Sequence, residues 1–200
     1  MPSKVSTPTS TEPDDQRARI LASALDVLRT QGASALTVRA VAKGAGCSTT
    51  GVYTWFGGKQ GLVEAIFVDG FHGFDAALVA GFASGDDLVA ASSYRDWALA
   101  NPTQYLVMFG GAVPGFEPSD EAKAVADVAF GHLVEWVAER RGLAGAEARH
   151  EAMRVWATVH GYVMLELAQM AEPLEGIDPE AQFVYGVAGL WPDPSPMAAR

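Results

Sequence analysis

Apolar residues recur three and four positions apart along most of the chain, and sustained period-two alternation is nearly absent. The spacing is clearest over residues 16–30, where the apolar stripe consists of Ile20, Leu21, Ala24, Leu25 and Leu28. This spacing places apolar side chains on one face of an α-helix, whereas a half-buried strand needs strict alternation. Gly32 is well placed to end this helix. The pattern predicts an all-α fold.

Helix-starting and helix-ending residues predict the elements that follow. Thr37 and Ser48 are suited to cap two short helices, and Gly57 and Gly58 break the chain before a long helix. The later helices are expected over residues 59–82, 86–100, 103–109, 119–141, 147–170 and 179–190. We therefore expect about nine helices and no sheet.

The segment from about Thr37 to Phe56 meets the physical requirements of a helix-turn-helix. Its two short helices flank a turn at Gly46, and small and β-branched residues supply the seam between them. On the second helix the remaining outward residues are small and polar, namely Thr49, Thr50 and Gly51. This profile suits a helix that enters the DNA major groove, because bulky side chains would hold its backbone away from the base edges.

Charge is distributed unevenly along the chain. The net charge of -10 alone argues against a nucleic-acid partner, because phosphate binding needs Lys and Arg. Residues 66–200 hold 7 cations and 19 anions, whereas residues 16–60 hold one anion, Asp26, and a net charge of +5. The cations of residues 16–60 are Arg17, Arg19, Arg29, Arg39, Lys43 and Lys59. The basic segment coincides with the predicted helix-turn-helix, which strengthens the DNA-binding interpretation.

The first seventy residues resemble the N-terminal domain of the TetR family of bacterial repressors. The resemblance is carried by RILASALDVLRTQG and LTVRAVAKGAG, by the spacing Ser48-x-x-x-Val52-Tyr53-x-x-Phe56, and by Lys59-x-x-Leu62. It implies a repressor that binds a palindromic double-stranded operator in the major groove and is released by a small ligand. The residues expected to contact DNA are Thr37, Arg39, Ser48, Thr49, Thr50, Gly51, Tyr53, Trp55 and Lys59. The chain departs from the family at Thr50-Gly51, where Gly-Thr is frequent, and at Trp55, where His or Tyr is frequent.

The remainder resembles more loosely one C-terminal subgroup of that family, named after its Trp, His and Gly. The similar segments are NPTQYLVMF and Trp156-x-x-x-His160-Gly161. They imply an all-helical pocket for a small apolar ligand and a homodimer formed through the last two long helices. The candidate lining residues are Trp97, Tyr105, Met108, Phe109, Phe116, Trp136, Trp156, His160 and Met164. Ordinary core packing is the alternative for each of them, because a helical body needs aromatic and Met core residues.

The resemblance divides the chain into functional parts. The expected parts are a disordered arm (1–13), a DNA-binding domain (14–74), an effector-binding and dimerisation domain (75–192) and a tail (193–200). Two arrangements are open for the apolar stripes of the last two long helices: an isologous four-helix interface or an intramolecular core. These stripes consist of Val155, Val159, Val163, Leu167, Phe183, Val184 and Val187.

Other classes of function have weaker support. The four His residues lack the spacing or the Cys company of a metal site, so we expect no metal and no cofactor. Neither a Gly-rich phosphate loop nor a nucleophile elbow occurs, and we expect no enzyme. A helical small-molecule-binding or metal-sensing protein without operator binding is the alternative. No membrane span or secretory signal is apparent, and the single Cys47 fits a reducing interior, so we expect a cytoplasmic protein.

Overall fold

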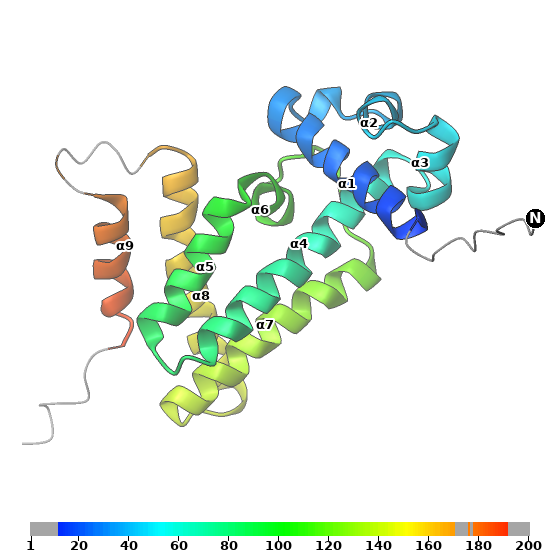
Figure 1. Ribbon diagram of the computed structural model, residues 1–200. Coiled ribbons are helices and arrows are strands. Elements are labelled where there is room, and N and C mark those ends of the chain that lie inside the picture. The colour runs from blue at the N-terminus through cyan, green and yellow to red at the C-terminus, as the bar shows by residue number, and fades with distance from the viewer. Residues whose placement is uncertain (1–11, 171–175, 177, 192–200) are drawn as a thin grey trace, which may run out of the picture. The chain divides into compact units, whose positions relative to one another are not determined.

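The computed structural model describes residues 12–170, 176 and 178–191. Within this part of the chain there are nine α-helices, one short 3-10 helix and no strand, which confirms the predicted all-α fold (Figure 1). Most of the predicted arm, residues 1–11, and all of the predicted tail, 193–200, lie outside the described residues.

The helix bounds follow the local capping chemistry. The elements are α1 (Glu12–Gln31), η1 (Ala33–Ala35), α2 (Val38–Gly44), α3 (Thr49–Phe56), α4 (Lys59–Phe82), α5 (Asp87–Ala100), α6 (Pro102–Phe109), α7 (Asp120–Arg141), α8 (Gly145–Leu167) and α9 (Pro179–Ala188). Thr37, Ser48, Asp86 and Asp178 each accept a hydrogen bond from a backbone N–H of the helix they precede. Such caps satisfy donors that have no partner within the helix. The short η1 helix is not predicted by the sequence pattern.

The chain divides into two compact units. The first unit comprises residues 1–69 and 103–122, and the second comprises residues 70–102 and 123–200. Helices α4 and α7 each contribute residues to both units. These units describe packing, and the functional boundary expected between residues 74 and 75 stays a prediction.

Helices α1, α2 and α3 pack together in the first unit. Its fully buried side chains include Ile20, Leu36, Val41, Val52, Leu62 and Ile66. The Ser23 hydroxyl donates to the Val41 carbonyl oxygen at 3.0 Å and ties α1 to α2. A Cβ at Gly44 would lie 2.2 Å from Ser23 Oγ, so a larger residue there would displace this hydroxyl from its hydrogen bond with Val41.

The segment 103–122 joins the first unit through the beginning of α4. The Glu64 carboxylate accepts hydrogen bonds from the Ser119 backbone N–H at 3.3 Å and from its hydroxyl at 3.0 Å. One turn earlier, the Gln60 amide donates to the Glu117 carbonyl oxygen at 3.1 Å. The loop before α7 is therefore attached to the helix that follows α3.

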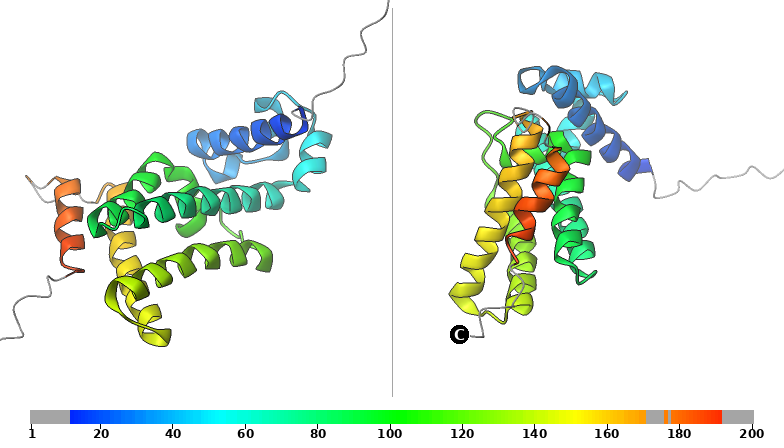
Figure 2. Two further views of the ribbon diagram at one scale, coloured as in Figure 1. Left: turned by 60° about the horizontal axis from the view of Figure 1, so that its bottom comes forward. Right: turned by 90° about the vertical axis from the view of Figure 1, so that its left-hand side faces the viewer.

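In the second unit, α5 packs against α8 and α9, and α9 lies alongside α8 (Figures 1 and 2). Arg95 on α5 forms two hydrogen bonds with the Glu166 carboxylate on α8, at 2.8 and 2.7 Å. Its guanidinium also lies 5.7 Å from the ring centroid of Phe183 on α9. One arginine therefore links three helices.

The apolar stripes of α8 and α9 form intramolecular core. Five of their residues are buried within the single chain: Val155, Val159, Val163, Phe183 and Val187. The remaining two, Leu167 and Val184, are partly buried. The four-helix interface is therefore the wrong alternative for the five buried side chains, because α5, α8 and α9 of one chain already cover them.

Candidate functional site

The helix-turn-helix begins with two hydroxyl caps. Thr37 Oγ1 accepts a hydrogen bond from the Ala40 N–H at 3.1 Å, and Ser48 Oγ accepts one from the Gly51 N–H at 3.1 Å. Each cap contributes about 1 kcal/mol to helix stability. Both helix starts are therefore fixed by residues that also lie on the exposed surface.

Helix α3 has a buried face and an exposed polar face. Val52 is fully buried and Phe56 nearly so. The exposed residues Thr49, Thr50, Tyr53 and Thr54 are spaced so that they share the opposite face. Tyr53 has 57% of its surface exposed, and Thr54 Oγ1 donates to the Thr50 carbonyl oxygen at 2.9 Å. The exposed face therefore consists of three small hydroxyl side chains and one phenol.

The junction between α3 and α4 is closed by glycines. Gly57 adopts a left-handed conformation, φ 68°, and its N–H donates to the Tyr53 carbonyl oxygen at 2.8 Å. A Cβ at Gly61 would lie 1.8 Å from the Phe56 carbonyl oxygen, which is closer than any side chain permits. Because that contact is with backbone, it fixes α3 against the first turn of α4.

The structure leaves most of the predicted DNA-contact residues exposed. These are Thr37, Arg39, Ser48, Thr49, Thr50, Tyr53 and Lys59, whereas Gly51 and Trp55 are half-buried. The Lys59 ammonium donates to the Ala33 carbonyl oxygen at 3.2 Å. A Cβ at Gly51 would lie 3.4 Å from Gln16 Nε2, so this position faces α1. DNA contact by each of these residues stays a prediction.

Helix α1 supplies neighbours of α3 that the sequence pattern does not identify. Gln16 lies beside Gly51, and the Arg17 guanidinium lies 5.5 Å from the Phe56 ring centroid. Arg17 belongs to the basic segment of residues 16–60, and this was the one feature of the sequence that could have indicated a role for it beside α3. Charge alone could not place it against α3, because that contact depends on how α1 packs.

Tyr94 is the polar centre of the aromatic cluster in the second unit. Trp156 Nε1 donates to the Tyr94 hydroxyl oxygen at 3.2 Å, and that hydroxyl lies 3.2 Å from His160 Nδ1. Burial lowers the pKa of His160 below its ordinary value of 6.5, which keeps the imidazole neutral at neutral pH. A neutral ring can accept a hydrogen bond at Nδ1 from the Tyr94 hydroxyl, while the hydroxyl oxygen accepts one from Trp156 Nε1. The structure therefore brings together Trp156 and His160 around a tyrosine that the prediction omitted.

Phe74 extends this cluster to a third predicted residue. Its ring centroid lies 4.8 Å from that of Tyr94 and 5.3 Å from that of Trp97. Trp136 instead stacks on Phe82, with centroids 4.8 Å apart and an interplanar angle of 16°. Met164 is half-buried on α8.

Four predicted lining residues belong to the first unit, namely Tyr105, Met108, Phe109 and Phe116. The ring centroids of Tyr105 and Phe109 are 4.9 Å apart, and those of Phe116 and Phe67 are 5.9 Å apart. The aromatic set is therefore divided between the units, and its role as a pocket lining stays a prediction.

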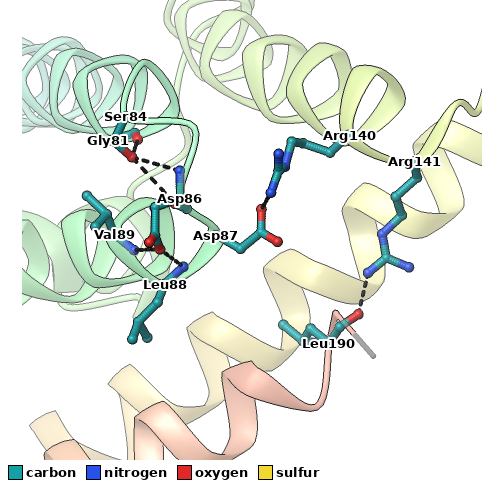
Figure 3. A network of polar contacts seen from close by, with 9 residues as sticks. All are labelled: Gly81, Ser84, Asp86, Asp87, Leu88, Val89, Arg140, Arg141 and Leu190. Atoms are coloured by element: carbon teal, nitrogen blue, oxygen red, sulfur yellow. Dashed lines mark hydrogen bonds and ion pairs between the residues drawn. The ribbon is translucent and has the colours of Figure 1, made fainter. Parts of the chain in front are cut away.

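A surface pocket of about 390 Å³ occurs in the second unit, beside the polar network in Figure 3. It is lined by Gly85, Asp86, Asp87, Leu88, Arg140, Val187, Ala188 and Trp191. Asp86 caps α5, and Asp87 pairs with Arg140 at 2.7 Å. Arg141 beside it donates to the Leu190 carbonyl oxygen at the end of α9. The charged side chains beside this pocket therefore cap α5 and connect the last turn of α7 to the start of α5 and to the residues that follow α9. The pocket is lined by none of the predicted ligand-lining residues, which in this unit are Trp97, Trp136, Trp156, His160 and Met164.

Two other kinds of site are absent from the described residues. Among these residues, no group of three or more His, Cys, Asp or Glu side chains is placed to hold a metal ion. No described helix is both long enough and apolar enough to cross a bilayer.

Two family models match most of the chain. The model for bacterial regulatory proteins of the tetR family matches residues 20–66, and the model for the tetracyclin repressor-like C-terminal domain matches residues 88–190. Together they cover the helix-turn-helix and most of the helices that follow it.

Individual relatives agree with these models. The crystal structure of the protein SCO4313, assigned as regulatory, is 30% identical with a TM-score of 0.81, and the match covers 92% of this chain and 98% of that one. The HTH-type transcriptional regulator Rv1816 of Mycobacterium tuberculosis is 28% identical over 147 residues. That match covers 68% of this chain, which spans only 62% of the relative's length. The uncharacterized HTH-type transcriptional regulator Rv0681 of the same organism is 28% identical over 87% of this chain and 79% of its own. These relatives are named as regulators and not as enzymes.

Proposed function

Because the chain belongs to the TetR family of bacterial transcription regulators, we propose that it binds a specific DNA sequence through α3. The observation that carries this proposal is the exposed face of α3, where Thr49, Thr50 and Tyr53 lie opposite the buried Val52. In a helix-turn-helix the second helix enters the major groove, and the first crosses the phosphate backbone. Exposed cations on α2 and the helix caps at Thr37 and Ser48 are suited to contact phosphates.

The proposed operator is palindromic and is bound by a homodimer. A two-fold dimer presents two recognition helices to half-sites about 34–36 Å apart, so the symmetry of the DNA mirrors that of the protein. Large apolar side chains remain exposed on α8 and α9, with Met153 46%, Leu165 48% and Tyr185 81% exposed. These side chains support dimerisation through the last two helices by faces other than the buried stripes.

The proposed regulator is a repressor that a small apolar ligand releases from DNA. Trp156, His160 and Trp97 lie around Tyr94 and Phe74, and they give an apolar cluster with a hydrogen-bonding centre. Ligand sites are commonly apolar with a few polar groups that fix orientation. A ligand releases the DNA only if it binds the released state of the dimer more tightly than the DNA-bound state.

Selection of bound sequences from a random pool of double-stranded DNA tests the DNA-binding proposal. We expect a palindromic sequence whose affinity falls steeply as salt rises, because phosphate contacts release counterions. Failure to enrich any sequence would contradict the proposal.

Two matched substitutions test the dimer. Tyr185→Glu places a charge on α9 and should convert the dimer to monomer in sedimentation equilibrium, with loss of operator affinity. Val128→Glu, at another exposed apolar position, on α7, is the control and should leave both unchanged. If the Tyr185 variant remained a dimer, the face of α9 that carries Tyr185 would not be part of the dimer interface.

The ligand proposal is tested on the operator complex with a panel of small apolar compounds. Trp156→Ala and His160→Ala should weaken the release caused by an active compound while sparing DNA affinity. A wild-type response in both variants would show that the aromatic cluster is not the ligand site.

A further inference from the structure

The chemical groups on the exposed face of α3 limit which bases that face can distinguish. The whole helix reads TTGVYTWF, so it carries no guanidinium, ammonium, carboxamide or carboxylate group. Guanine is most often recognised by the paired donors of Arg or by Lys, adenine by the donor and acceptor of Asn or Gln, and cytosine by carboxylates. None of these contacts is available from α3.

What α3 does present is methyl groups and hydroxyl groups. A threonine hydroxyl can pair with several base edges and discriminates little, whereas a threonine methyl group is suited to the 5-methyl group of thymine. Thr54 donates its hydroxyl proton to the Thr50 carbonyl oxygen at 2.9 Å, so it presents to a partner its methyl group and an oxygen that can only accept a hydrogen bond. Thr49 and Thr50 lie one turn earlier on the same exposed face.

The nearby cations lie outside α3: Arg39 and Lys43 are on α2, Arg17 is on α1, and Lys59 begins α4. Arg39 and Lys43 are exposed on α2, the helix that crosses the phosphate backbone in this motif. Contacts from them position the protein and carry no direct sequence information when they end on phosphates.

From these observations we propose that α3 recognises its half-site mainly through thymine 5-methyl groups, at positions that face Thr49, Thr50 and Thr54. The inference rests on the proposed function, because it names the DNA chemistry that the same surface would recognise. The expected half-site is A·T-rich where α3 enters the groove. The alternative is guanine recognition by Arg39 or Lys43.

The test replaces single thymines by deoxyuridine in the sequence selected by the wild-type protein. This change removes only the 5-methyl group and keeps the base pair. Affinity should fall about fourfold for each contacted methyl group, the factor expected when one buried apolar carbon is lost. Methyl removal outside the α3 contact should have no effect.

Variants of the protein identify which threonine of α3 contacts the methyl group. Thr49→Ser, Thr50→Ser and Thr54→Ser each remove a methyl group and keep the hydroxyl. At least one should bind the thymine operator about fourfold more weakly and bind the matching deoxyuridine operator as the wild type does. Thr158→Ser is the control, because Thr158 on α8 in the second unit also donates its hydroxyl to a carbonyl oxygen four residues earlier.

The outcomes separate this inference from the proposed function. If the wild type binds its selected operator and neither deoxyuridine nor the serine variants alter affinity, methyl recognition is wrong and operator binding stands. Dependence on guanines that Arg39→Ala abolishes would also overturn it, in favour of α2. If no sequence is selected at all, the proposed function fails and this inference fails with it.

Discussion

Tyr53 on α3 and Tyr94 on α5 show how differently the two units use one side chain. Tyr53 has 57% of its surface exposed, and its phenol lies on the polar face of the recognition helix. Tyr94 is only 5% exposed, and its hydroxyl is engaged with Trp156 and His160. A polar side chain that the chain exposes is available to a partner, whereas one that the chain buries acts first on the fold itself.

The same contrast holds for charge. Arg39 and Lys59 in the first unit are exposed. Arg95 and Glu166 in the second unit are paired, with side chains 12% and 19% exposed. We therefore expect substitutions on the exposed face of α3 to affect binding with little effect on stability, and substitutions of buried or paired groups in the second unit to do the reverse. The following changes test that difference.

The largest effect is expected at Gly61. An alanine there places its Cβ against the Phe56 carbonyl oxygen, so Gly61→Ala should lower the free energy of unfolding by about 3 kcal/mol. This exceeds the gain of about 1 kcal/mol that alanine normally brings to a helix. Gly131→Ala on α7, where the new Cβ has no described atom within 4 Å apart from the backbone of its own helix and its chain neighbours, should be neutral or stabilising. Urea denaturation measures both, and equal effects would refute the tight α3–α4 junction.

Arg95→Met should be the next most damaging change. It leaves the Glu166 carboxylate partly buried without its partner, and we expect a loss of about 2 kcal/mol in the free energy of unfolding. The double variant Arg95→Met with Glu166→Leu should recover most of that loss, because the isolated charge is gone. Operator affinity should stay unchanged. Lost affinity with unchanged stability would reverse the assignment of roles to the two units.

Ser48→Ala should cost less, about 1 kcal/mol in the free energy of unfolding, because only the cap of α3 is lost. Ser34→Ala, at an exposed position in η1, is the control and should be neutral. Thermal denaturation followed by circular dichroism compares the two. Identical midpoints would mean that the Ser48 cap does not stabilise α3.

The smallest effect concerns pH and His160. Burial lowers its pKa in the folded state below 6.5, so the unfolded state takes up a proton first as the pH falls. The stability associated with the neutral imidazole is therefore complete above pH 6.5 and is lost as the pH falls from there to the folded-state pKa. His160→Gln should flatten this part of the stability profile, measured by urea denaturation across that range. An unchanged slope would contradict the buried neutral state.

The sequence predicted elements well where the signals are local. The long helix expected over residues 59–82 is α4, Lys59–Phe82, because Gly57 and Gly58 precede it and Ser84 and Gly85 follow it. The caps at Thr37 and Ser48 were predictable for the same reason. A cap depends on residues only a few positions apart.

Tertiary features were less accessible. Periodicity identified the apolar stripe of Val155, Val159 and Val163, but it could not tell whether the same chain or a second copy covers them. Tyr94 was omitted because nothing along α5 distinguishes it, and its importance depends on residues more than sixty positions away. The aromatic set likewise gave no sign that its members fall in two packing units.

The most direct measurement is the affinity of Tyr53→Ala for the operator selected by the wild-type protein, followed by fluorescence anisotropy. Tyr53 has 57% of its surface exposed, so the variant should retain the wild-type fold and free energy of unfolding to within about 0.5 kcal/mol. If α3 is the surface that enters the major groove, affinity should fall by about tenfold or more. A folded Tyr53→Ala protein that binds with undiminished affinity would contradict the assignment of α3 as the DNA-reading helix.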